Sequence, residues 1–126
     1  KPKKILIANR TVSKAESLIN KYKNLFSNIH LLSSDDLNSP DVVINGSSAG
    51  LTGKFQPVEI NTKETTAFYD LNYSLETTPF CEWAIQASPR VFDGIGMLVN
   101  QAAYSFDIWF GVKPKTEQVL EDIKAL

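Results

Sequence analysis

Cysteine, methionine and histidine each occur only once in the 126 residues. The single cysteine, Cys81, excludes a disulfide framework and a zinc site built from cysteines, so we expect a reducing cytoplasm. The single histidine, His30, lies inside an apolar strand pattern, where a structural role is commoner than a catalytic one. No bound metal is therefore expected.

The sequence also lacks an excess of charge of one sign and a long apolar run. Thirteen basic against fourteen acidic residues give a formal net charge of −1. This balance argues against nucleic acid or a membrane surface as a partner. No apolar run approaches the ~20 residues that a membrane span requires. With 43% hydrophobic residues, we expect one domain over residues 1–126 with a single core.

Short apolar runs alternate with helical spacing along the chain. The runs predict five strands, at residues 4–8, 29–32, 41–45, 65–71 and 89–94. Apolar spacing and breaker residues predict four helices, at residues 12–26, 78–87, 96–111 and 115–126. Short buried strands separated by helices predict an α/β fold with a mostly parallel sheet and flanking helices.

Two cations follow the end of the first expected strand. The strand ends at Asn9, Arg10 and Thr11, and Lys14 follows in the first turn of the next helix. Ligands of such sheets lie beyond the carboxyl ends of the strands. An arginine can donate two parallel charge-assisted hydrogen bonds to a phosphate, so the set indicates the 2′-phosphate of NADP in preference to NAD. The residues alone equally allow a solvated arginine, with Ser13 as the helix N-cap.

Two later stretches are typical of a cofactor site. "INGSSAG" (44–50) ends a strand in glycines and hydroxyls, which lets backbone approach a ligand closely. "DGIGMLVNQAAYSFDIW" (93–109) places two glycines before a helix that carries Met97 and Gln101. A glycine turn leaves room for a flat ring, and a helix start points amides at it. An ordinary loop and a core helix are the alternatives.

Four motifs carry a resemblance to a known family. They are "NRTVSKAE" (9–16), "VINGSSAGL" (43–51), "YDLNYSLETTPFCEWA" (69–84) and "DGIGMLVNQAAYSFDIWFGVKP" (93–114). In order and spacing, the chain resembles the carboxyl-terminal half of shikimate dehydrogenases over essentially its whole length. The resemblance implies a Rossmann-like, NADP-binding oxidoreductase domain. Such enzymes reduce 3-dehydroshikimate to shikimate in aromatic amino-acid biosynthesis, the shikimate pathway.

The resemblance also implies roles for ten positions, each carried over by its motif. The residues implied to bind the adenosine 2′-phosphate are Asn9, Arg10, Thr11 and Lys14. Those implied to contact the rest of the cofactor are Ser47 and, near the nicotinamide, Leu71, Gly94 and Met97. Those implied to reach the substrate are Tyr73 and Gln101. "NGSS" replaces the more usual Asn-Ala-Thr-Ser, and Leu71 stands where methionine is also found.

Two features of the family have no counterpart in the 126 residues: the glycine-rich phosphate loop, and the amino-terminal domain with its catalytic lysine and aspartate. We expect a fragment that is truncated before its second strand, carries no catalytic residue and shows no dehydrogenase activity. Asp70, Asp93 and Asp107 have simpler interpretations, as strand-end, turn and helix-surface polarity.

The expected truncation also predicts how the chain assembles. In the strand order 3-2-1-4-5-6, the first strand is the shared neighbour of the strands at 4–8 and 41–45. Both would then expose unpaired edges, and exposed edges readily pair with another chain. We expect a homo-oligomer formed through these edges.

Three classes of function stay open at this point. The first is an NADP-dependent shikimate dehydrogenase, or a paralogue acting on quinate. The second is a non-catalytic NADP-binding module. The third is glutamyl-tRNA reductase, which shares the Asn-Arg-Thr motif, although the helix at 93–109 argues against it.

Overall fold

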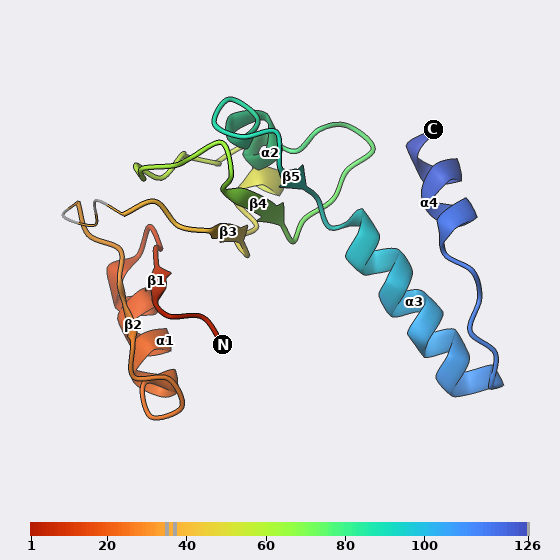
Figure 1. The fold of residues 1–126 in the computed structure, drawn as a ribbon, viewed down its shortest axis with the longest axis horizontal. Helices are drawn as coiled ribbons and strands as arrows, with labels where there is room; N and C mark the ends of the chain where they lie inside the picture. Colours follow the sequence, from red (N-terminus) through yellow and green to blue (C-terminus); the bar gives the residue numbers. More distant parts are fainter. Residues whose placement is uncertain (35, 37, 126) are drawn as a thin grey trace. The chain divides into compact units, whose positions relative to one another are not determined.

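The computed structural model describes residues 1–34, 36 and 38–125, which divide into two compact units (Figure 1). Unit 1 comprises Lys1–Asn38 and Val58–Asn61, and unit 2 comprises Ser39–Pro57 and Thr62–Leu126. No helix of the described residues is long and apolar enough to cross a membrane.

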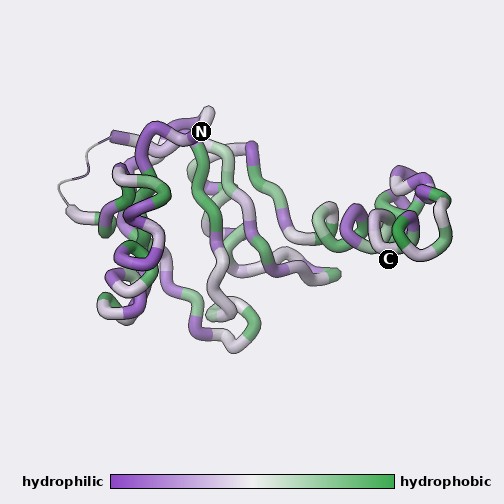
Figure 2. The backbone as a smooth tube through the Cα atoms, turned by 90° about the horizontal axis from the view of Figure 1, so that it is seen from below, coloured by the Kyte–Doolittle hydropathy of each residue, from purple (hydrophilic) through white to green (hydrophobic). Residues whose placement is uncertain are grey.

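Unit 1 consists of two parallel strands and the helix that connects them. β1 (Ile5–Ile7) pairs with β2 (Ile29–Leu31), and α1 (Val12–Tyr22) packs on β2. Hydrophilic and hydrophobic positions alternate along α1, as expected of a helix with one buried side (Figure 2). Ala15 of α1 and Ile29 of β2 form the buried part of this unit, with exposures of 2% and 6%.

The helix predicted at 12–26 ends earlier, at Tyr22. The backbone amides of Leu25 and Phe26 both donate to the Tyr22 carbonyl, at 2.9 and 3.0 Å, so the chain leaves the helix through a turn. Leu25 is 80% exposed. The apolar spacing therefore overstated the helix, because Leu25 lies in solvent and the chain turns at Tyr22.

Unit 2 is built on a three-stranded parallel sheet. β3 (Val42–Asn45), β4 (Ala67–Asp70) and β5 (Val91–Phe92) pair in the order β3-β4-β5. Each of the five predicted strands is present, although each is shorter than its apolar run. The predicted α/β fold with parallel strands and flanking helices is confirmed.

Four helical segments complete unit 2. They are η1 (Gly50–Thr52), α2 (Pro79–Ala84), α3 (Ile95–Phe110) and α4 (Glu117–Lys124). The sequence predicted the three α-helices but not the short 3-10 turn η1, and Leu126 of the last predicted helix lies outside the described residues. α3 ends at Gly111, whose φ of 69° favours glycine.

α2 covers one face of this sheet and forms the core of unit 2 with it (Figure 1). Phe68 of β4 is 0% exposed, and Phe80 of α2 is 3% exposed. The ring of Trp83 meets the Phe68 ring edge-on, with centroids 5.5 Å apart at 89°. This packing fixes the direction of β4, and with it the place where the strand ends.

Candidate functional site

The carboxylate of Asp70 lies at the end of β4 and is 1% exposed. Its Oδ1 accepts hydrogen bonds from Asn45 Nδ2 at 2.9 Å, from Asn72 N at 3.0 Å and from Asn72 Nδ2 at 2.9 Å. Its Oδ2 accepts a bond from the Thr78 hydroxyl at 2.7 Å. All four partners donate, and this is the arrangement that a buried carboxylate requires.

Asn72 extends this network to two further loops. Its Nδ2 also donates to the Ser47 carbonyl at 2.7 Å, and its own carbonyl accepts the Gly94 amide at 2.9 Å. The Ser47 amide and hydroxyl both donate to Asn45 Oδ1, at 3.0 and 2.8 Å. The segments that follow β3, β4 and β5 are thus joined at one end of the sheet.

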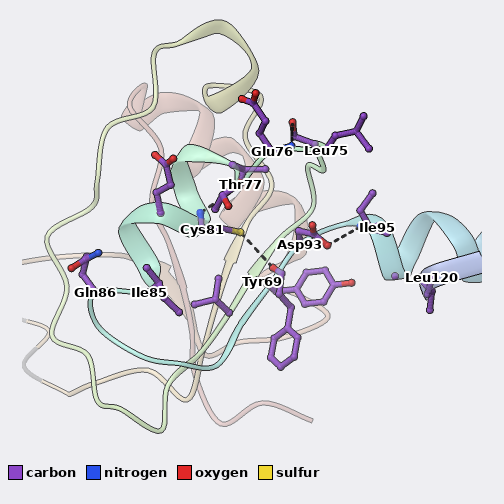
Figure 3. A pocket seen from close by; sticks show the side chains of 16 residues that line it. Tyr69, Leu75, Glu76, Thr77, Cys81, Ile85, Gln86, Asp93, Ile95 and Leu120 are labelled. Atoms are coloured by element: carbon purple, nitrogen blue, oxygen red, sulfur yellow. Dashed lines mark hydrogen bonds between the residues drawn. The ribbon is translucent and has the colours of Figure 1, made fainter. Parts of the chain in front are cut away.

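Gly94 lies where α3 begins, and it is buried. A Cβ atom at this position would lie 2.6 Å from the Leu71 carbonyl oxygen and 3.0 Å from that of Asn72. Any larger residue would therefore push the start of α3 away from the segment that follows β4. Asp93, just before it, accepts the Ile95 amide at 3.1 Å, and this confirms the prediction of a turn residue (Figure 3).

Four of the predicted contact residues in unit 2 have side chains that reach solvent. Leu71, Tyr73 and Met97 are 42%, 47% and 43% exposed, and Gln101 is also exposed. Met97 and Gln101 are four residues apart on α3 and share one side of it. The exposed side chains of unit 2 therefore include apolar and neutral polar groups, a combination that suits a flat ring and a hydroxylated ligand.

The other predicted contacts, Asn9, Arg10, Thr11 and Lys14, lie together in unit 1 and are all exposed. The Thr11 amide donates to Asn9 Oδ1 at 2.9 Å, and the Lys14 amide donates to the Thr11 carbonyl at 3.0 Å. Thr11, and not Ser13, is the N-cap of α1, and no acidic residue stands in the first turn. Two cations at a helix start, with no acidic residue in the first turn, favour an anion.

A groove of about 810 Å³ lies beside β4, β5 and α2 (Figure 3). It is lined by Tyr69, Cys81 and Asp93, among other side chains. Burial raises the pKa of the Cys81 thiol, which therefore stays protonated at neutral pH and is a poor nucleophile. Among the described residues, no group of His, Cys, Asp or Glu side chains could hold a metal ion.

Comparison with known proteins gives consistent matches. Residues 94–123 match the family model of the shikimate 5′-dehydrogenase C-terminal domain. A protein of Marinobacter nauticus named shikimate dehydrogenase (NADP(+)) is 41% identical over 128 residues, which cover 98% of this chain and 46% of the relative. This chain is homologous to shikimate dehydrogenases.

Solved structures agree with this relationship. A crystal structure of an Ael1 enzyme from Pseudomonas putida is similar with a TM-score of 0.76 and 35% identity, over 97% of this chain and 46% of that one. A shikimate dehydrogenase crystallised in complex with NADP+ has a TM-score of 0.71 and 28% identity, again over 97% and 46%. The chain thus spans about half the length of the shikimate dehydrogenases that it matches, and the predicted resemblance is confirmed.

Sequence analysis singled out Ser47, Leu71 and Gly94, but not the buried carboxylate of Asp70 or the two asparagines that bond to it. Ser47, Leu71 and Gly94 are all joined to one network, as their order along the chain suggested. Asp70 is not simple strand-end polarity, because it is the buried acceptor of that network. The available signal was an aspartate that ends a buried strand and is followed two residues later by Asn72.

Replacing Gly94 by alanine should lower the free energy of unfolding of this chain by about 1–3 kcal/mol. The new Cβ would clash with backbone carbonyls that cannot rotate away. Urea unfolding measures the loss. Gly96→Ala is the matched control: nothing lies within 4 Å of a Cβ at Gly96, and alanine in a helix is favoured by about 0.5–1 kcal/mol. Equal stability of the two variants would contradict the close approach at Gly94.

Proposed function

We propose that these 126 residues form the NADP-binding part of a shikimate dehydrogenase, which interconverts 3-dehydroshikimate and shikimate. The observation that supports the proposal is the strand-end network of unit 2, because its hydrogen bonds join the backbone of Ser47, Leu71 and Gly94. The homology to enzymes named shikimate dehydrogenase (NADP(+)) supports the assignment, as does a similar structure that binds NADP+.

The proposal assigns cofactor contacts to each unit separately. In unit 1, Arg10 and Lys14 bind the adenosine 2′-phosphate, while Asn9 and Thr11 add neutral donors. In unit 2, the start of α3 at Gly94 holds the nicotinamide ring. These residues fit NADP. Arg10 and Lys14 lie at the start of α1, and the first turn of α1 contains no acidic group that would repel a phosphate.

The nicotinamide and substrate contacts come from the exposed side chains around the network. Leu71 and Met97 offer apolar surface to the ring, and Ser47 lines the cofactor. Tyr73 and Gln101 donate and accept hydrogen bonds, as recognition of a hydroxylated, carbonyl-bearing substrate requires. NADPH supplies the hydride when it is bound, and these residues orient it and exclude water.

We place this activity in the cytoplasm. The only cysteine of the sequence, Cys81, is a free and buried thiol. Thiols stay reduced in that compartment, whereas small exported domains usually depend on disulfides.

Arg10→Ala should raise the Michaelis constant for NADP roughly ten- to hundredfold in the enzyme that carries these residues, with little change for NAD. The reason is the loss of charge-assisted bonds to a phosphate that NAD lacks. Steady-state kinetics with both cofactors measure the effect. Lys21→Ala is the control, since it removes a cation from the last turn of the same helix and should change neither constant. Equal losses with NADP and NAD would show that Arg10 does not bind the phosphate.

A polypeptide of these 126 residues alone should self-associate and oxidise no shikimate. Among the described residues β1 pairs only with β2, and β3 only with β4, so each leaves an open edge. Next to the β3 edge, Ile44 is 64% exposed on the face away from α2. We also assign no general base to accept the hydroxyl proton of shikimate as the hydride leaves. Light scattering and an NADPH absorbance assay test both points, and a stable monomer or measurable turnover would contradict the respective expectation.

A further inference from the structure

Asp70 is a buried charge with no described role in binding. Its side chain is 1% exposed, and the part of the chain that the structure describes gives it no lysine or arginine partner. It is instead satisfied by four hydrogen bonds from neutral donors. Apolar residues of similar size would avoid the desolvation cost of a charge at this position. Packing alone therefore does not explain why a carboxylate stands at this position.

The hydrogen bonds of Asp70 converge on one short segment. Two of the four come from Asn72, through its backbone amide and its side-chain amide. Asn72 lies between Leu71 and Tyr73, whose side chains are exposed beside the site. The second proton of the same side-chain amide is donated to the Ser47 carbonyl. Fixing Asn72 thus fixes the backbone on both sides of it.

We propose that Asp70 is a positioning residue: its carboxylate holds Asn72, and through Asn72 it sets the direction of Leu71 and Tyr73 toward the reacting groups. This inference rests on the proposed function for the identity of those groups. Asp70 itself touches neither cofactor nor substrate in this account. Its effect comes from the geometry that it imposes, because small displacements of contact groups at a reacting centre slow the reaction strongly.

The network also predicts which substitution preserves the arrangement. In Asp70→Asn, the amide oxygen can keep the three bonds from Asn45 and Asn72. The amide nitrogen then faces the Thr78 hydroxyl, which can accept as well as donate. In Asp70→Ala no acceptor remains at this position for the four donors, although the Asn72 side-chain amide still donates to the Ser47 carbonyl. Asp70→Ala should therefore free Asn72 and its neighbours Leu71 and Tyr73 to move, and Asp70→Asn should keep them in place.

The test compares kinetics in the full polypeptide that carries these residues. Asp70→Ala should lower kcat roughly 10- to 100-fold. The KM for NADP should change by less than about threefold, because Arg10 and Lys14, which are proposed to bind the phosphate, lie in unit 1. Asp70→Asn should restore most of kcat. Asp41→Ala is the matched control, since Asp41 is exposed at the start of β3 and should change neither constant.

A second measurement separates positioning from general loss of stability. Amide hydrogen exchange should become faster at Asn72 and Gly94 in Asp70→Ala and stay unchanged in α1. Unchanged kcat in a folded Asp70→Ala variant would overturn the inference, as would equal losses in kcat and NADP affinity with faster exchange everywhere. If Asp70→Ala does not fold, Asn72→Ala keeps Asp70 bonded to Asn45 and Thr78. It should then lower kcat in the same way, and no loss would again overturn the inference.

The two proposals fail differently in these experiments. If the wild-type enzyme does not oxidise shikimate with NADP, the proposed function is wrong, while the exchange data still decide whether Asp70 holds Asn72. If the wild type is active and Asp70→Ala matches it, only the positioning role is wrong.

Discussion

The buried carboxylate of Asp70 is the constraint on which the strand ends of unit 2 depend. A charge that is removed from water must be surrounded by donors, and leaving it unpaired would cost several kcal/mol. Asn45, Asn72 and Thr78 therefore have to converge on it. The end of β3 and the segment that follows β4, 25 residues apart, meet for this reason. The hydrophobic core formed by α2 and β4 places the carboxylate where they can do so.

In unit 1 the charged groups proposed to bind the cofactor are exposed, whereas Asp70 of unit 2 is buried. Arg10 and Lys14 are exposed, and their positive charge stays available because no acidic side chain stands in the first turn of α1. Elsewhere in this unit, the ammonium of Lys4 donates to the Asp36 carboxylate and lowers the pKa of that carboxyl, so an ion pair does form where no ligand is expected. The difference between the ion-paired Lys4 and the exposed Arg10 and Lys14 supports the proposal that Arg10 and Lys14 bind a phosphate.

Much of the fold follows from local sequence signals. The five apolar runs predict all five strands, and Gly111 predicts the end of α3, because a left-handed residue there favours glycine. The C-terminal end of α1 could not be predicted, since Leu25 looks apolar in the pattern yet lies in solvent. Spacing alone cannot tell which apolar residues meet a partner.

The residues proposed to contact the cofactor could be selected from sequence, whereas the hydrogen-bond network at the strand ends of unit 2 could not. Arg10 and Gly94 stand out because few residues can bind a phosphate bidentately or fit a tight backbone approach. The bonds from Asn45 to Asp70 and from Asn72 to Ser47 each join residues 25 positions apart. Such contacts depend on the parallel register of β3 and β4, and no local pattern encodes that register.

A crystal structure of the enzyme that carries these residues, in complex with NADP+, tests the central claim most directly. We expect the adenosine 2′-phosphate at about 2.7–3.2 Å from the Arg10 guanidinium. The nicotinamide ring should lie beside Gly94 and Met97. A dinucleotide whose 2′-phosphate lies away from Arg10, or whose nicotinamide lies away from the start of α3, would contradict the account.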